Sequence, residues 1–224
     1  MVDAMDHHHR EYYDTISREL YTAVLADIMD KLGYREQIVA PQIRPLYAEA
    51  TIVGRAATML AVDSYEVPLK PYEKEMELLD DLAEGEVVVC TWHGTRPLAI
   101  WGELLSTCAR ARGGRGALID GYSRDAAAIG EMRFPVFAAG LSPADSMGRC
   151  EVIEIRVPVE VGGVLVDDGD LVVADFDGCV IVPQAIEDAV ISQAMEKVRG
   201  ENLVRDELRE GKSIREVFAR YGIL

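Results

Sequence analysis

An arginine followed directly by an aspartate, Arg124-Asp125, ends a stretch whose residue types could support chemistry on an acidic substrate. The stretch, residues 102–125, reads GELLSTCARARGGRGALIDGYSRD. A guanidinium group can hold a carboxylate through two parallel hydrogen bonds. An aspartate oxygen is a hard ligand suited to Mg²⁺, which keeps several of its waters. The same two residues could equally form an ordinary surface ion pair, so their neighbours must distinguish the two interpretations.

The first element that must position this pair is a helix that begins at Gly102. Its first turn would contain Glu103, Leu104 and Leu105. The N–H groups of a first turn have no partner within the helix, so a carboxylate or phosphate can bind there. Gly102 would let a ligand approach the backbone closely. Every helix has such an end, so this feature alone has little specificity.

The second element is a short apolar strand, GALID (116–120), that leads into the loop with Arg124 and Asp125. Asp120 ends the strand, and Tyr122 lies between it and the Arg-Asp pair. Ligands of α/β sheets tend to bind beyond the carboxyl ends of strands. One arginine, one or two acids and a row of amides could therefore hold an α-keto acid and its metal ion.

Strands and helices alternate along the chain, which predicts an α/β fold with a partly parallel sheet covered by helices. The expected helices cover residues 10–33, 73–82 and 102–113, and the expected strands cover 51–62, 86–92, 116–120 and 135–139. Short β-branched segments separated by glycine- and aspartate-rich turns then predict an antiparallel meander over 151–183. Residues 184–222 return to a helical pattern.

The chain is expected to form one domain, 1–224, because it contains no linker or internal repeat. Residues 1–14 are expected to be flexible, and residues 184–224 to form a C-terminal helical arm. The apolar residues of this arm form only a narrow stripe: Leu203, Val204, Leu208, Ile214 and Val217. A helix with so little to bury often packs on a partner subunit, which favours a homo-oligomer. Packing of the arm on its own core is the equal alternative.

Composition restricts the classes of protein further. With 49% hydrophobic and 28% charged residues among 224, the chain resembles a soluble globular protein. A net charge of −16 argues against a nucleic-acid partner, and it requires a local cation for any anionic substrate. Four scattered cysteines without CxxC spacing favour reduced thiols in a cytoplasmic protein. Neither a membrane-spanning run nor a secretory signal is evident, so no membrane partner is expected.

Several other patterns are given structural interpretations. GGRGALIDG precedes its strand instead of following it, which excludes a dinucleotide-binding turn. Asp167, Asp168 and Asp170 lack the later glutamate of a calcium loop and are expected to serve as turn residues. His93 is expected to be a structural hydrogen-bonding residue instead of a catalytic base.

The central stretch, residues 102–125, resembles the RraA-like family. Three further blocks match in order: TAVLADIMDKLG (22–33), SPADSMGR (142–149) and VPVEVGGVLVDDGDLVVADFDGCVIVP (157–183). That family contains the 4-hydroxy-4-methyl-2-oxoglutarate aldolases and the protein regulators of ribonuclease E activity. The resemblance implies a layered α/β/β/α sandwich of the swivelling phosphohistidine-domain type. It also implies homotrimers or homohexamers with sites at the subunit interfaces.

The aldolases of this family carry an acid, twenty spacer residues, Arg-Asp, two further residues and a second acid. The corresponding positions here are Glu103, Arg124-Asp125 and Ala128. By that match Asp125 would ligate Mg²⁺ or Mn²⁺ directly, and Glu103 would hold a metal-bound water. Arg124 would bind the substrate carboxylate and the developing enolate.

The resemblance also extends to the surroundings of the site, with two departures. Backbone amides of Leu104 and Leu105 would complete a carboxylate pocket, and Glu201 of the arm would ligate the metal from a neighbouring subunit. The aldolases usually have aspartate where this chain has Glu103. The final acid is missing at Ala128, as it is in the ribonuclease regulators.

The sequence therefore predicts a metal-dependent (class II) pyruvate aldolase that cleaves an oxo acid through a pyruvate enolate. The substrate would be of the 4-hydroxy-4-methyl-2-oxoglutarate type, and oxaloacetate would be decarboxylated through the same enolate. Arg124, Glu103 and Asp120 are the expected catalytic residues, and Tyr122 is expected to shape the substrate pocket. The alternatives are a non-catalytic regulator that binds an RNA-processing enzyme, and a related lyase that acts on a sugar-derived acid.

Overall fold

The computed structural model describes residues 10–92, 94 and 96–223, so His93 lies outside the described residues. The helices are α1 (Arg10–Glu19), α2 (Thr22–Lys31), α3 (Glu73–Asp80), α4 (Glu103–Ala111), α5 (Ala126–Glu131), α6 (Glu187–Arg209) and α7 (Ile214–Tyr221). The strands are β1 (Arg44–Pro45), β2 (Ile52–Asp63), β3 (Glu86–Trp92), β4 (Ala99–Trp101), β5 (Gly116–Ser123), β6 (Val136–Leu141), β7 (Cys150–Ile155), β8 (Val159–Val161), β9 (Val164–Val166), β10 (Leu171–Asp175) and β11 (Gly178–Val182). The predicted mixed α/β fold is confirmed.

Within the described residues the main sheet has nine strands, in the order β1-β6-β5-β3-β2-β10-β11, with β4 beside β5 and β7 beside β2. Strands β2, β3, β5 and β6 are parallel to one another, as expected from the alternation of strands and helices. Strand β2 is the longest, and one of its edges is shared by two antiparallel partners. Its first half pairs with β10, and its second half pairs with β7.

The expected continuous meander over residues 151–183 is wrong. Strand β7 pairs with β2, β8 and β9 form a separate two-stranded sheet, and the β10–β11 hairpin joins the other half of β2. Short strands and turns are present in this region, as predicted, and each of these strand pairs is antiparallel. The error concerned partners, since a twelve-residue strand offers enough edge for two segments that are distant in sequence.

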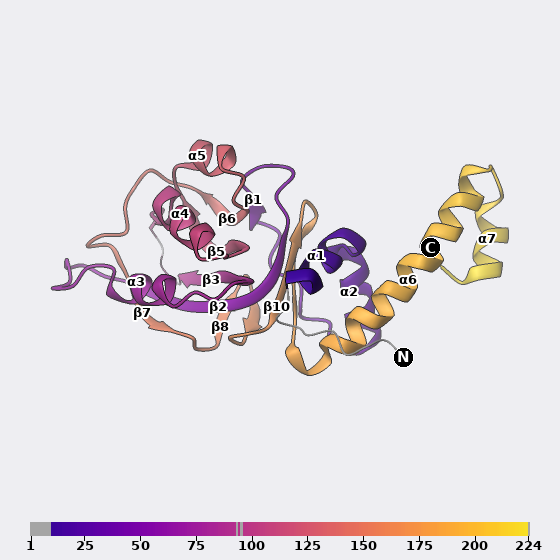
Figure 1. The fold of residues 1–224 in the computed structure, drawn as a ribbon, viewed down its shortest axis with the longest axis horizontal. Helices are drawn as coiled ribbons and strands as arrows, with labels where there is room; N and C mark the ends of the chain where they lie inside the picture. Colours follow the sequence, from indigo (N-terminus) through magenta and orange to yellow (C-terminus); the bar gives the residue numbers. More distant parts are fainter. Residues whose placement is uncertain (1–9, 93, 95, 224) are drawn as a thin grey trace.

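Alternating side chains of the sheet face two different hydrophobic clusters. In β3, Val88 and Cys90 join α3, α4 and α5, whereas Val87 and Val89 pack with the β8–β9 hairpin and the inner face of β10–β11. A third cluster joins the outer face of β10–β11 to α1, α2 and α6. Figure 1 shows these last three helices on one side of β10 and α3, α4 and α5 on the other. Assignment to the swivelling phosphohistidine type stays a prediction.

The N-terminal helical segment differs from expectation in two ways. It is divided into α1 and α2 by an extended backbone at Tyr21, where φ is −143° and ψ is 161°. Of residues 1–14, which were expected to be flexible, 1–9 lie outside the described residues and 10–14 belong to α1. The helix is ordered there because the rings of Tyr12 and Tyr13 are buried. The Tyr12 hydroxyl donates a hydrogen bond of 2.6 Å to Glu187 Oε1, which ties α1 to α6.

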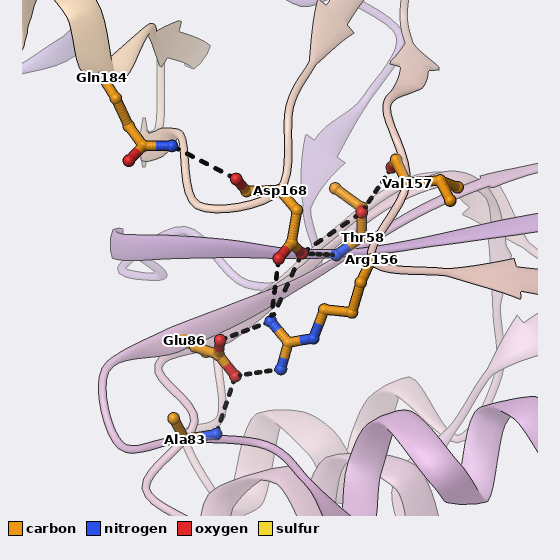
Figure 2. A network of polar contacts seen from close by, with 7 residues as sticks. All are labelled: Thr58, Ala83, Glu86, Arg156, Val157, Asp168 and Gln184. Carbon is orange, nitrogen blue, oxygen red and sulfur yellow. Dashed lines mark hydrogen bonds and ion pairs between the residues drawn. The ribbon is translucent and has the colours of Figure 1, made fainter.

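A polar network holds together the turns at one end of β3, β7 and β9 (Figure 2). Arg156 donates to both oxygens of Glu86, at 2.6 and 2.8 Å. Its Nη1 also lies 3.4 Å from Asp168 Oδ1, which accepts the Thr58 N–H at 3.0 Å. Asp170 accepts the backbone N–H groups of Asp167 and Gln184. Asp167, Asp168 and Asp170 are turn residues, as predicted.

The C-terminal arm consists of two helices. Figure 1 shows α6 running away from the sheet, with α7 folded beside its far end. Val204 and Val217 are buried, whereas Leu203, Ile214 and Phe218 are about half exposed. Part of the apolar stripe is therefore used within the arm, and docking of the rest on a partner subunit stays a prediction. Among the described residues, no helix combines the length and apolar character needed to cross a membrane.

Candidate functional site

Arg124 and Asp125 occupy the short connection between the carboxyl end of β5 and α5. The Arg124 N–H donates to the Trp101 carbonyl at 2.9 Å, which fixes the end of β5 beside the start of α4. Asp125 has the left-handed backbone φ of 58°, a conformation that aspartate tolerates better than most residues. Its Oδ2 accepts the Glu103 N–H at 3.2 Å. The predicted helix start and the predicted Arg-Asp pair therefore meet.

Gly102 is required at this junction for space. A Cβ atom at Gly102 would lie 2.9 Å from Asp125 Oδ2 and 3.2 Å from Arg124 Cγ. Its φ of −158° is ordinary extended backbone, which any residue could adopt. The absence of a side chain at Gly102 thus allows the Asp125 carboxylate to reach the first turn of α4.

We expect Gly102→Ala to displace the Asp125 carboxylate while changing the free energy of unfolding by about 1 kcal/mol or less. The reason is that an added methyl group meets a flexible side chain and forces no change in φ. On the prediction that Asp125 ligates Mg²⁺, titration with Mg²⁺ by calorimetry should show clearly weaker binding than in the wild type. The control is Gly130→Ala in α5, where a Cβ atom has nothing within 4 Å. Equal Mg²⁺ affinity in both variants would contradict the proposed crowding.

The first turn of α4 has the features expected of an anion-binding helix start. Among the described residues, the Leu104 and Leu105 N–H groups have no acceptor. Leu104 is 77% exposed, whereas Leu105 packs against the cluster beneath the helix. Glu103 is half-buried, and its Oε1 accepts a hydrogen bond of 2.7 Å from the Thr107 hydroxyl. Thr107 therefore holds the Glu103 carboxylate against the side of α4.

One residue of the site was missed by the sequence reasoning. Asp145 Oδ1 lies 3.0 Å from Arg124 Nη1, and its Oδ2 accepts the Tyr72 hydroxyl at 2.8 Å. Burial alone would raise the pKa of Asp145, but the Tyr72 hydrogen bond, Arg124 and two backbone N–H groups together lower it. Asp145 lies in the loop after β6, the parallel neighbour of β5. Loops at the carboxyl ends of neighbouring strands meet, and this was the available signal.

The charges at this site favour a divalent cation. Two carboxylates, those of Asp125 and Asp145, lie 3.7 and 3.0 Å from the single guanidinium group of Arg124, and the acidic Glu103 begins the helix beside them. The negative charge of these side chains exceeds that of the one guanidinium group. It would repel the carboxylate of a substrate unless a cation offset it. The described residues contain no group of three or more His, Cys, Asp or Glu side chains arranged to hold a metal. A cation bound here would therefore have at most two of these side chains as ligands and water in its other positions, which Mg²⁺ accepts. That Asp125 and Glu103 are those two ligands stays a prediction.

Three predicted site residues have contacts elsewhere in the structure. Asp120 Oδ2 accepts the Gly162 N–H at 2.7 Å, which links β5 to the β8–β9 turn. Tyr122 packs against the hydrophobic cluster under α4, and its ring lies over Gly140. Glu201 accepts a hydrogen bond from the Tyr21 hydroxyl, between α1 and α2, and pairs with Lys197 of its own helix. The fold of one chain does not bring Glu201 to the start of α4, so its role from a second copy stays a prediction.

A buried carboxyl lies close to the site in α3. Glu75 is only 6% exposed, and burial raises its pKa to about 7, with smaller contributions from Asp145 and Glu151. It lines a cleft between residues 68–75 and 147–153, next to Tyr72. Near neutral pH this side chain exists in both protonation states.

We expect the contribution of Glu75 to the free energy of unfolding to fall as pH rises from about 5 to 8. Its pKa in the folded state lies above the ordinary value of 4.5, so the folded state retains a proton that the unfolded state loses. The stabilisation from Glu75 is fully present when pH lies below its pKa in the unfolded state. Once pH exceeds its pKa in the folded state, about 3 kcal/mol of the free energy of unfolding is lost. Urea unfolding of Glu75→Gln should therefore show a flatter pH profile. The exposed Glu66→Gln is the control, and an unchanged slope in Glu75→Gln would contradict the prediction.

The amino-acid sequence matches one family model and several known proteins. Residues 22–181 match a family model described as RraA-like, Aldolase/RraA. A relative from Halalkalibacterium halodurans named "Putative 4-hydroxy-4-methyl-2-oxoglutarate aldolase" is 28% identical over 180 residues, 80% of each chain. One of the same name from Laribacter hongkongensis is 29% identical over 161 residues, 72% of this chain and 96% of the relative.

Solved structures are similar to this chain over most of its length. RraAS2 of Streptomyces coelicolor, described as an unusual member of the RNase ES inhibitor RraA protein family, superposes with a TM-score of 0.78. It is 26% identical, and the match covers 88% of this chain and 96% of that one. An uncharacterized protein from Pseudomonas syringae pv. tomato gives a TM-score of 0.83 at 26% identity over 95% of both chains.

Proposed function

The chain belongs to the RraA-like family, and from this premise we propose that it is a lyase that cleaves a pyruvate-derived oxo acid with Mg²⁺ or Mn²⁺. The relatives named as aldolases support the reaction class. The observation that carries the proposal is the position of the Asp125 carboxylate. Its Oδ2 lies 3.2 Å from the Glu103 backbone nitrogen at the start of α4 and 3.7 Å from Arg124 Nε, so a carboxylate, a guanidinium group and free amides lie close together.

Each side chain has a defined task in this proposal. Asp125 and Glu103 would hold the divalent cation, which supplies a Lewis acid for the substrate oxygen when it is bound. The Leu104 and Leu105 N–H groups receive the substrate carboxylate at the helix start. Arg124 stabilises the negative charge that develops on the pyruvate enolate more than the charge of the ground state. Because decarboxylation of oxaloacetate yields the same enolate, we expect both reactions.

The direct test incubates the purified protein with Mg²⁺ or Mn²⁺ and either 4-hydroxy-4-methyl-2-oxoglutarate or oxaloacetate. Pyruvate should form faster than with the metal alone, and removal of the metal by a chelator should stop the reaction. Pyruvate formation no faster than the metal-only rate with both substrates would overturn the proposal. Activity confined to a sugar-derived acid would instead support the related lyase.

We expect Ala128→Glu to increase affinity for Mg²⁺. Ala128 is exposed in the first turn of α5, three positions after Asp125, so an acid there returns to the place where the aldolases carry one. A further carboxylate near the cation should strengthen binding on the order of tenfold. The matched control is Ala127→Glu, which adds the same charge to the neighbouring position of the helix. Equal gains in both variants would show a general charge effect and contradict a ligand position at Ala128.

A second candidate function follows from the Streptomyces structure, whose description names an RNase inhibitor. A regulator of this kind would bind an RNA-processing enzyme without metal and without turnover. The missing acid at Ala128 favours this candidate. Pull-down of an RNase E-type enzyme in the presence of a chelator, combined with no pyruvate formation, would support the regulator over the lyase.

We also propose that the chain assembles as a homotrimer or homohexamer, with Glu201 of one copy directed to the site of the next. Light scattering coupled to gel filtration measures the mass. A monomer at micromolar concentration would exclude this arrangement. The exposed Leu203, Ile214 and Phe218 of the arm offer the apolar surface that such an assembly needs.

A further inference from the structure

We propose that Asp145 and Tyr72 are positioning residues that set the orientation of the Arg124 guanidinium group, an inference that rests on the proposed lyase function. Neither residue touches the expected metal ligands. They form a chain of contacts instead, from the Tyr72 hydroxyl to Asp145 Oδ2 and from Asp145 Oδ1 to Arg124 Nη1.

Hydrogen bonds to both the side chain and the backbone fix the position of Asp145, so it can orient Arg124. Its Oδ2 accepts the Tyr72 hydroxyl at 2.8 Å and the Met147 N–H at 3.3 Å. Its own carbonyl accepts Arg149 Nη1 at 2.9 Å. The side chain and the backbone of Asp145 are therefore both fixed, and the Oδ1 atom is left to face Arg124.

The guanidinium group of Arg124 lies between two carboxylates. Nη1 is 3.0 Å from Asp145 Oδ1, and Nε is 3.7 Å from Asp125 Oδ2. Among the described residues, Nη2 has no acceptor. Two ion pairs on separate nitrogens, the closer one to Asp145, restrict the orientation of the guanidinium group, and Nη2 stays available for a substrate oxygen.

The backbone at Tyr72 supports the same conclusion. Tyr72 immediately precedes α3 and has the left-handed φ of 63°, which a tyrosine rarely adopts. Strained residues of this kind persist where the surroundings hold them, and they cluster at functional sites. Here the strained residue is the one whose hydroxyl reaches across to the loop after β6. The side chain is half-buried, and it lines the same cleft as Glu75.

Tyr72→Phe and Asp145→Asn test the inference, because both keep the size of the side chain. Tyr72→Phe removes one hydrogen bond to Asp145 and should lower kcat for pyruvate formation about fivefold, with KM changed less than twofold. Asp145→Asn removes the charged partner of Arg124 and should lower kcat roughly tenfold to a hundredfold. The control is Tyr65→Phe on the preceding loop, whose side chain is 83% exposed.

The decisive comparison repeats both substitutions in an Arg124→Met background. Positioning residues act through Arg124, so neither substitution should lower the remaining activity by more than twofold there. Losses of the same size in both backgrounds, or losses that follow the melting temperature, would overturn the inference and leave a purely structural role.

A binding measurement separates this inference from the lyase proposal. Oxalate resembles the planar enolate of pyruvate, and its affinity in the presence of Mg²⁺ is measured by calorimetry without turnover. Tyr72→Phe should weaken oxalate binding about fivefold, because Arg124 loses its orientation. If the wild type binds oxalate but forms no pyruvate, only the lyase proposal fails. If Tyr72→Phe binds oxalate like the wild type, the positioning inference fails.

Discussion

Substitution of Asp125 by asparagine is expected to lower kcat/KM for pyruvate formation several hundred-fold, equivalent to about 3–4 kcal/mol of transition-state stabilisation. Asparagine has the same size and can accept the Glu103 N–H at the position where Oδ2 now does. It lacks the charge that would hold a divalent cation, and it leaves Arg124 without one of its carboxylate neighbours. The fold should therefore survive while the chemistry is lost.

The measurement is the initial rate of pyruvate formation at several Mg²⁺ concentrations, together with a melting curve. Glu131→Gln is the matched control, because Glu131 is exposed at the other end of the helix that Asp125 precedes. The control should retain wild-type activity. If Asp125→Asn retains more than about a tenth of wild-type kcat/KM, the Arg124-Asp125 pair is an ordinary surface ion pair and the site lies elsewhere.

The second large effect concerns stability. Arg55→Met is expected to reduce the free energy of unfolding by about 3–5 kcal/mol, because it removes the guanidinium group that pairs with the buried Glu187 carboxylate. The two side chains are 7% and 1% exposed, and Arg55 Nη2 donates to Glu187 Oε1 at 2.7 Å. The pair joins β2 to α6, and Tyr12 of α1 donates to the same carboxylate. The loss should therefore loosen α1 and α6 together.

Urea unfolding followed by circular dichroism measures this effect. The control is Arg133→Met, which breaks the exposed pair with Glu49 and should change the free energy of unfolding by less than about 1 kcal/mol. The double variant Arg55→Met/Glu187→Leu should recover part of the loss, since no unpaired charge remains. A single Arg55→Met change below about 1 kcal/mol would show that the buried pair does not hold these elements together.

The site was predictable to the extent that its parts are local in sequence. The helix start at Gly102, the strand end before Arg124 and the approach of the two follow from the order of elements. The contribution of Asp145 was not predictable in the same way. It depends on which direction a loop side chain takes, and its partner Tyr72 precedes it by more than seventy residues.

The fold shows the same division. The parallel strands and the helices beside them were predicted from periodicity, because each pattern is local. The continuous meander over 151–183 and the flexibility of residues 10–14 were predicted wrongly. In both segments the structure depends on partners that are distant in the sequence. Tyr12 is ordered because its hydroxyl meets Glu187, 175 residues away. A pattern of residue types carries no information about a partner at that distance.

The shared edge of β2 has a consequence for synthesis of the protein in the cell. Its two antiparallel partners, β7 and β10, leave the ribosome long after β2 itself, since Ile52 pairs with Ala174 and Asp63 with Cys150. Until then a long apolar strand presents unsatisfied backbone groups along one side, a template for pairing with another chain. Nascent chains that stall before residue 150 should therefore be the species that aggregates and that chaperones recognise.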